Sequence, residues 1–239
     1  ICPVYTLGFL PDLKRIKKIS KKYNLKIVGD AACALGSRFK GNKISKYNDA
    51  VCYSFNGNKS LTAGGGGAIS INNDKLQKNI FLMSTNGKSG DYYHKIAGHN
   101  FRITGIHAAL GLGQIINFKK IKKLKEKLTK NYIEFFTKNN FKTIYPKNNN
   151  IIQWFNFFIC KKNQDINKIL KYMNKKNIDM KKFWRPLHLQ PCIKRKGFVN
   201  PQFNTNKIWG KIVILPSSFN LKQKQLKYIQ NNLKILFSA

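Results

Sequence analysis

Hydrophobic residues near the start of the chain change their spacing twice, and this change predicts a strand, a helix and a second strand. Residues 1–6 are rich in β-forming side chains. Asp12 is a plausible N-cap for a helix through residue 23, in which apolar residues recur at helical spacing. Residues 25–28 form a buried apolar run, and Asp30 follows it. A strand–helix–strand unit indicates a parallel sheet, whose ligands bind at the C-terminal ends of its strands.

Two later apolar runs enclose a glycine-rich loop. Residues 49–55 and 67–71 each have the length and composition of a strand. The loop between them contains one lysine, Lys59, and ends in the glycine run 64–67. Lys59 is therefore expected near a strand end, where a ligand of the sheet would bind.

The rest of the chain alternates helices and short strands, which predicts a second, smaller domain. Pro146 and the asparagine run 148–150 form the best candidate linker. We expect part of a large domain over 1–103, a long interdomain helix and linker over 104–146, and a small C-terminal α/β domain over 147–239. The expected elements are helices over 74–83 (capped by Asp74), 104–136, 165–176 and 221–237, and strands over 154–160 and 212–215.

The formal net charge of +36 is the most unusual feature of the composition. A polyanionic partner such as nucleic acid is one explanation of such a charge. The lysines are spread along the whole chain, however, and Lys, Asn and Ile are abundant together, as shared A/T-rich codons would produce. A dedicated nucleic-acid surface should cluster its charge. We therefore interpret the charge as compositional and expect no specific nucleic-acid partner.

Cysteine, histidine and apolar patterns argue against several classes of protein. The five cysteines are odd in number and irregularly spaced, which favours a reducing cytoplasm over a disulfide framework. The four histidines have no metal-ligand spacing, so no metal is expected. The sequence has no run of 18 apolar residues, so no membrane partner is expected either.

Lys59, Asp30 and Ser54 together supply the groups that a pyridoxal 5'-phosphate (PLP) site uses. An amine can form a Schiff base, a carboxylate can pair with the pyridine nitrogen, and a hydroxyl can donate to the phosphate. Each residue also has a simpler explanation, because Lys59 is one of many lysines, Asp30 could cap a helix, and Ser54 could face solvent. Their shared position at strand ends favours the PLP hypothesis.

Four ordered motifs resemble those of the DegT/StrS-type sugar aminotransferases, which are PLP enzymes of fold type I, the aspartate aminotransferase fold. The resemblance covers nearly the whole chain. It implies an α/β protein with the C-terminal part of the large mixed-sheet PLP-binding domain, a long linking helix and a small C-terminal α/β domain. The motifs are Asp30-Ala31-Ala32 with Leu35-Gly36, Ser54-Phe55 with Lys59 and glycines 64–67, Asn100-Phe101-Arg102-Ile103 with Ala108-Ala109-Leu110-Gly111, and Pro186-Leu187-His188-Leu189-Gln190-Pro191, followed by Leu215-Pro216.

The resemblance implies a role for each of these site residues. Lys59 would form the Schiff base with PLP and carry protons during the reaction. Asp30 would pair with the pyridine nitrogen, and Ser54 would bind the phosphate. Asn100 would reach the phosphate of the partner subunit's cofactor, so that a homodimer shares its active sites.

Two residues and one missing segment need separate comment. His188 lies in a segment that would flank the substrate, without an assigned chemical role. Cys33 stands near the expected cofactor ring, where the family usually has Gln, Glu or His. The family's main phosphate loop and ring-stacking aromatic precede the region that this sequence matches. We therefore expect an N-terminally truncated chain that retains PLP weakly and has little or no turnover by itself.

The reaction that the resemblance implies is a transamination in the cytoplasm. An amino group, expected from glutamate, would move to a nucleotide-linked 4-keto-6-deoxy sugar for surface polysaccharide. The lysine motif is most similar to the branch that makes 4-amino sugars of the legionaminic acid or bacillosamine type. The alternatives are a PLP-binding relative without turnover and a basic nucleic-acid-binding module. A related sugar dehydratase would have histidine in place of the lysine, so Lys59 argues against it.

Overall fold

The internal contacts of the computed structural model divide the chain into two units. Unit 1 comprises Ile1–Lys123 together with residues 151–154. Unit 2 comprises Leu124–Tyr145 and the described part of Phe155–Ala239. The residues that the structure describes are 1–145, 151–161, 164–193 and 204–238.

Helix α4, Phe118–Lys138, has residues in both units, because the boundary after Lys123 falls inside it. The domain division expected at 103 and 146 stays a prediction. The expected linker at Pro146 and 148–150 lies outside the described residues.

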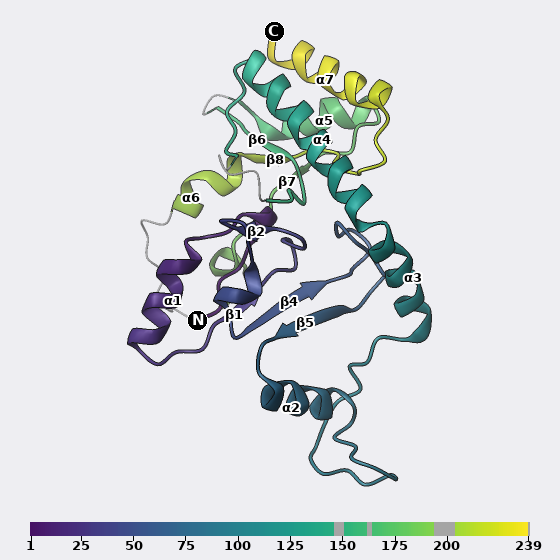
Figure 1. The fold of residues 1–239 in the computed structure, drawn as a ribbon. Coiled ribbons are helices and arrows are strands. Elements are labelled where there is room, and N and C mark those ends of the chain that lie inside the picture. Colours follow the sequence, from purple (N-terminus) through teal and green to yellow (C-terminus); the bar gives the residue numbers. More distant parts are fainter. Residues whose placement is uncertain (146–150, 162–163, 194–203, 239) are drawn as a thin grey trace. The chain divides into compact units, whose positions relative to one another are not determined.

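Unit 1 is built on a mixed three-stranded sheet in the order β1-β4-β5 (Figure 1). Strand β1, Val28–Asp30, pairs in parallel with β4, Ala50–Ser54, and β4 pairs antiparallel with β5, Gly67–Ile71. The parallel pair is the one that the strand–helix–strand pattern predicts. The segment that follows Asp30 at the end of β1 and the loop with Lys59 that follows β4 therefore leave the same edge of the sheet.

The first strand of the predicted unit is reduced to a single bridge between Val4 and Asp30. Pro3 has no N–H to donate, although its carbonyl accepts from the Asp30 N–H at 2.9 Å. The second strand also begins later than predicted, at Val28 instead of residue 25. The Ile27 N–H is taken by the Asp49 carboxylate at 2.7 Å, so it cannot join a strand ladder.

Helix α1, Leu13–Lys22, forms where its pattern predicts it, with Asp12 accepting from the Arg15 N–H as the N-cap. Helix α2, Asp74–Ser84, is also present, but its cap is Asn73 and not Asp74 as expected. The Asn73 side chain accepts from the Leu76 N–H at 2.8 Å. A short hairpin, β2 (Arg38–Phe39) and β3 (Asn42–Lys43), was not predicted.

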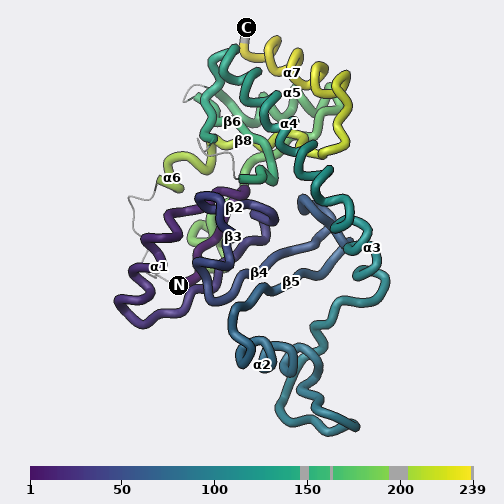
Figure 2. The backbone as a smooth tube through the Cα atoms, viewed as in Figure 1, coloured from purple at the N-terminus to yellow at the C-terminus, as the bar shows by residue number. Residues whose placement is uncertain are grey.

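The single long helix predicted over 104–136 is two helices, α3 (Gly105–Ile116) and α4. Asn117 separates them, and its side-chain amide donates to the Gly113 carbonyl at 3.0 Å. Such side-chain bonds compete with helix hydrogen bonds, which explains why a continuous apolar pattern is interrupted. The chain between α2 and α3 runs out and back as a loop (Figure 2), bridged between Thr85 and Asn100.

Unit 2 has an antiparallel sheet in the order β6-β8-β7 with helices packed on its core. Its predicted strands and helices are present with shorter limits, and β7 and α6 were not predicted. The elements are β6 (Phe157–Ile159), α5 (Ile166–Lys175), β7 (Lys181–Lys182), α6 (Asn204–Ile208), β8 (Ile212–Ile214) and α7 (Gln223–Ser238).

Each unit has its own hydrophobic core. In unit 1, Tyr5, Leu13 and Val51 are among the buried residues between α1 and the sheet. In unit 2, Tyr132 and Phe136 of α4 pack with Phe158 and neighbouring apolar residues. Within the part of the chain that the structure describes, no helix is both long and apolar enough to cross a membrane.

Candidate active site

The loop after β4 places Lys59 at the C-terminal edge of the unit 1 sheet. Phe55 closes the loop, because its N–H donates to the Gly66 carbonyl and its carbonyl accepts from the Ala63 N–H, both at 2.9 Å. Leu61 and Ala63 are buried and anchor the returning half of the loop. Lys59 is half-buried as a result, with its side chain directed into the protein.

The glycines at the end of this loop permit a close approach of the backbone. Gly66 has a φ of +82°, a conformation that favours glycine. A Cβ on Gly67 would lie 2.4 Å from the Tyr53 carbonyl oxygen of the neighbouring strand. Gly66 and Gly67 are therefore needed for β5 to begin beside β4.

The Lys59 amine has two close neighbours. Its Nζ lies 3.7 Å from the Sγ of Cys33 and 3.7 Å from the centroid of the Trp154 ring. Burial raises the pKa of the Cys33 thiol, while the nearby positive charge of Lys59 lowers it and the carboxylate of Asp30 raises it. Cys33 thus contacts the predicted amine. The predicted carboxylate, Asp30, lies at the end of β1, the parallel neighbour of the strand that leads to Lys59.

Asp30 is held firmly at the end of β1. Its N–H donates to the Pro3 carbonyl, and its carbonyl accepts from the Tyr5 N–H, both at 2.9 Å. The Oδ1 atom accepts from the Ala32 N–H at 3.0 Å. Among the described residues no hydrogen bond to Oδ2 is found, so this oxygen can accept from a ligand. Such a half-buried carboxylate fits the nitrogen of a protonated pyridine ring.

Ser54 lies at the end of β4, one strand away from Asp30. Register pairs Asp30 with Cys52, so Ser54 is two residues beyond that level. Its Oγ accepts weakly from the Asn56 N–H at 3.4 Å, which leaves the hydroxyl proton available for a phosphate. An amine, a carboxylate and a hydroxyl thus lie along one sheet edge, and these groups fit PLP.

Asn100 and His188 are not part of this cluster. Asn100 is exposed in the loop between α2 and α3, and its expected contact is with a partner subunit, which a single chain does not test. His188 lies in unit 2, in the short 3₁₀ turn Leu187–Leu189, where its Nε2 is 2.6 Å from the Oδ1 of Asn206. The roles expected for both residues stay predictions.

Trp154 is the residue that sequence reasoning missed at this site. The sequence predicted a strand over 154–160, which is wrong at this residue because β6 begins only at Phe157, and Trp154 lies in unit 1. The residue is 1% exposed, and its Nε1 donates to the Asn58 carbonyl at 2.7 Å. No local pattern could reveal this contact, because it joins segments 96 positions apart.

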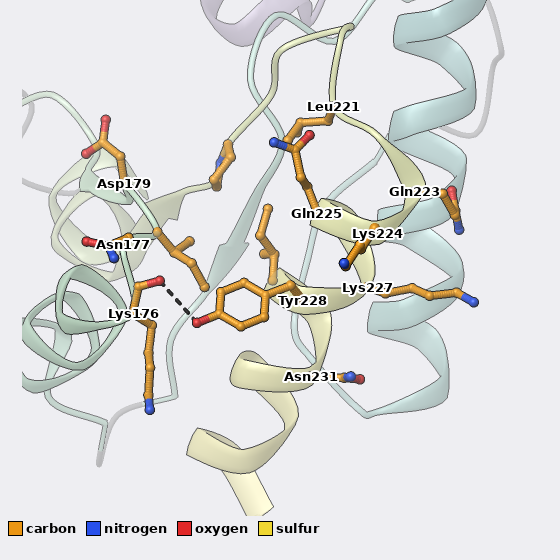
Figure 3. A pocket seen from close by; sticks show the side chains of 13 residues that line it. Lys176, Asn177, Asp179, Leu221, Gln223, Lys224, Gln225, Lys227, Tyr228 and Asn231 are labelled. Carbon is orange, nitrogen blue, oxygen red and sulfur yellow. Dashed lines mark hydrogen bonds between the residues drawn. The ribbon is translucent and has the colours of Figure 1, made fainter.

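A large cavity of about 1020 Å³ lies elsewhere, within unit 2, and contains none of the predicted site residues (Figure 3). The Tyr228 hydroxyl donates to the Lys176 carbonyl at 3.3 Å across it. Among the described residues that line it, Asp179 is the one carboxylate, and its Oδ2 is 3.3 Å from the Nζ of Lys181. Among the described residues there is also no group of three or more His, Cys, Asp or Glu side chains that could hold a metal.

Comparison with known proteins decides the family. Residues 1–234 match the sequence model of the DegT/DnrJ/EryC1/StrS aminotransferase family. The chain belongs to this family. The predicted family and the α/β fold class are therefore confirmed, as is the predicted cofactor, because aminotransferases of the DegT family use PLP.

Several relatives of this DegT-family chain carry names that describe amino-sugar synthesis. A GDP-perosamine synthase of Caulobacter vibrioides is 37% identical over 117 residues, which are 48% of this chain and 32% of that protein. Another, from Escherichia coli O157:H7, is 24% identical over 98% of this chain and 65% of its own length. The chain thus spans less than two thirds of the length of these curated relatives.

Solved structures show the same fold over the whole chain. Helicobacter pylori PseC, an aminotransferase involved in the biosynthesis of pseudoaminic acid, has a TM-score of 0.90 at 24% identity and is covered over 67% of its length. Spr1654 from Streptococcus pneumoniae, in its PLP-form, has a TM-score of 0.85 at 20% identity and is covered over 68%. At these identities the likeness establishes the fold.

Proposed function

We propose that this chain is the lysine-bearing part of a PLP-dependent transaminase that aminates a nucleotide-linked 4-keto-6-deoxy sugar. The observation that carries the proposal is that Asp30, at the end of β1, and Lys59, in the loop after its parallel neighbour β4, lie at the same edge of the sheet, with Cys33 3.7 Å from the lysine amine. The printed names of the relatives, GDP-perosamine synthase and UDP-4-amino-4,6-dideoxy-N-acetyl-beta-L-altrosamine transaminase, support a nucleotide sugar as the acceptor. Glutamate is the proposed amino donor, and surface polysaccharide is the proposed destination of the product.

Each site residue has a defined task in this proposal. When bound, PLP supplies an aldehyde that condenses with amines and a ring that accepts electrons. Lys59 holds the cofactor through its amine and, when free, carries a proton to or from the reacting carbon. Asp30 keeps the ring nitrogen protonated through the Oδ2 atom, and Ser54 donates its hydroxyl to the phosphate.

Two parts of the proposal concern the assembly. Asn100 reaches the phosphate of a cofactor held by a second copy, so a homodimer in the cytoplasm shares its sites. Apolar side chains on α3 support an interface there, because they are exposed in the single chain. They include Ile106, Leu110, Leu112, Ile115 and Ile116.

Reductive labelling tests the central assignment. PLP is added to the purified protein, borohydride reduces the Schiff base, and peptide mapping locates the pyridoxyl group. We expect the label mainly on Lys59 and a loss of most of it in Lys59→Met. A label distributed over surface lysines, unchanged in Lys59→Met, would falsify the assignment. Lys75, an exposed lysine of α2, provides the matched control variant Lys75→Met.

A further inference from the structure

A short segment from late in the sequence enters unit 1 and delivers Trp154 to the lysine loop. The Ile152 N–H donates to the Ser37 Oγ at 3.0 Å, and the Trp154 N–H donates to the Leu7 carbonyl at 3.2 Å. Gly8 allows this passage, because a Cβ there would lie 2.4 Å from the Ile152 carbonyl oxygen. The backbone position of Trp154 is therefore fixed by contacts independent of Lys59.

The Trp154 side chain then contacts the loop at two points, the backbone just before Lys59 and the tip of the Lys59 side chain. Its Nε1 donates to the Asn58 carbonyl at 2.7 Å, which holds the backbone just before Lys59. Its ring centroid lies 3.7 Å from Lys59 Nζ, which holds the tip of the side chain. The N–H of a buried indole needs a hydrogen-bond acceptor, and the face of its ring attracts a cation. Both requirements are met here by the lysine loop.

We propose that Trp154 is a positioning residue for Lys59, holding its amine at the cofactor edge of the sheet. A lysine stem has four rotatable carbons, so an unheld amine would sample many positions. With the indole against it, Nζ stays 3.7 Å from the Sγ of Cys33, which follows Asp30 by three residues at the end of β1. This inference rests on the proposed function, since it concerns the same lysine.

Two other roles for Trp154 predict different results. If the ring only filled the core, its loss would affect stability without changing which lysine reacts. If the ring only stabilised the ammonium form of Lys59, its removal would favour the neutral amine and raise the reaction of Lys59 with PLP. A positioning role predicts the opposite, because an amine released from the indole would leave the place where PLP binds.

The experiment measures the ratio of pyridoxyl label on Lys59 to label on the exposed Lys75 after PLP and borohydride treatment of the 239-residue chain. We expect Trp154→Leu to lower this ratio about tenfold, because the released side chain regains much of the rotamer freedom of a lysine. Trp154→Phe keeps an aromatic face and loses the N–H, so its ratio should fall less. Trp184→Leu, at an exposed tryptophan of unit 2, is the control and should leave the ratio unchanged.

An unchanged or higher ratio in Trp154→Leu overturns the inference, and a melting curve shows whether that variant is folded. If it is not folded, Trp154→Phe decides, and a ratio equal to or above that of the wild type overturns the inference. The label on Lys59 of the wild-type protein distinguishes failure of this inference from failure of the proposed function. If the wild type itself carries no excess label on Lys59, then the function assigned to that lysine fails first.

Discussion

The amine of Lys59 lies 3.7 Å from the thiol of Cys33, although the two residues are 26 positions apart in the sequence. Each residue follows a strand, and β1 and β4 are parallel neighbours, so both segments emerge at the same edge. The pair has an electrostatic consequence, because burial raises the pKa of Cys33 and the lysine charge opposes that rise. This chain thus has a thiol beside its predicted Schiff-base amine.

Alkylation of Cys33 should report the lysine charge. In Lys59→Met the pKa of Cys33 rises further, so less thiolate is present at pH 8. Iodoacetamide should therefore react with Cys33 up to about threefold more slowly than in the wild type. Mass spectrometry of the cysteine peptides gives the rate, with exposed Cys2 and Cys192 as internal references. Lys75→Met should leave the rate unchanged. A faster rate in Lys59→Met would contradict this prediction, because it would show that the lysine mainly blocks access to the thiol and does not mainly favour its thiolate form.

Asp30→Asn should weaken the retention of PLP without unfolding the protein. An Asn side chain can still accept from the Ala32 N–H, but it cannot form an ion pair with a pyridine nitrogen. Loss of a hydrogen bond to a charged group should raise the dissociation constant for PLP about tenfold to hundredfold. Absorbance titration with PLP gives this constant. Equal binding by both proteins would remove Asp30 from the site.

Some of this arrangement follows from the sequence and some does not. Strands β4 and β5 are short apolar runs bounded by glycine and polar residues, so local pattern defines them well. The α3–α4 break was missed because Asn117 acts through a side-chain bond that apolar spacing does not contain. Trp154 was missed for a different reason, since its contact with Asn58 exists only after distant segments pack.

Ser54→Ala should weaken the binding of PLP and leave the binding of pyridoxal unchanged. The two compounds differ by the phosphate, which is the group that the Ser54 hydroxyl is proposed to contact. We expect about a tenfold increase in the dissociation constant for PLP alone. Competition between the two compounds for labelling of Lys59 measures both constants. A similar loss for pyridoxal would mean that the substitution disturbs the end of β4 and not a phosphate contact.

Gly67→Ala should destabilise unit 1, because the new Cβ would lie 2.4 Å from the Tyr53 carbonyl oxygen, a backbone atom that cannot move alone. We expect a loss of about 2–4 kcal/mol in the free energy of unfolding, typical of overpacking against backbone. Gly57→Ala is the matched control in the same loop, since a Cβ there meets nothing within 4 Å. Denaturant unfolding compares the two, and equal stability would contradict the close approach of β4 and β5.

The charge of Lys125 inside unit 2 should make stability depend on pH. Lys125 of α4 is 5% exposed and donates to the Ser217 carbonyl at 3.1 Å. Burial lowers its pKa from 10.5 to about 8. The unfolded chain therefore binds more protons between pH 8 and 10.5, and the contribution of this group to stability rises with pH in that window.

Comparison of wild type with Lys125→Met isolates this contribution from those of other groups that titrate at alkaline pH. We expect wild type to gain on the order of 3 kcal/mol relative to the variant between pH 8 and 10.5, because one pKa unit corresponds to about 1.4 kcal/mol. Below pH 8 the difference should be constant, since the lysine is then charged in both states. Urea unfolding at several pH values measures the difference. Lys127→Met, at an exposed position of the same helix, should run parallel to wild type. If the free energy of unfolding of Lys125→Met instead changed with pH as that of the wild type does, Lys125 would have to be accessible to solvent.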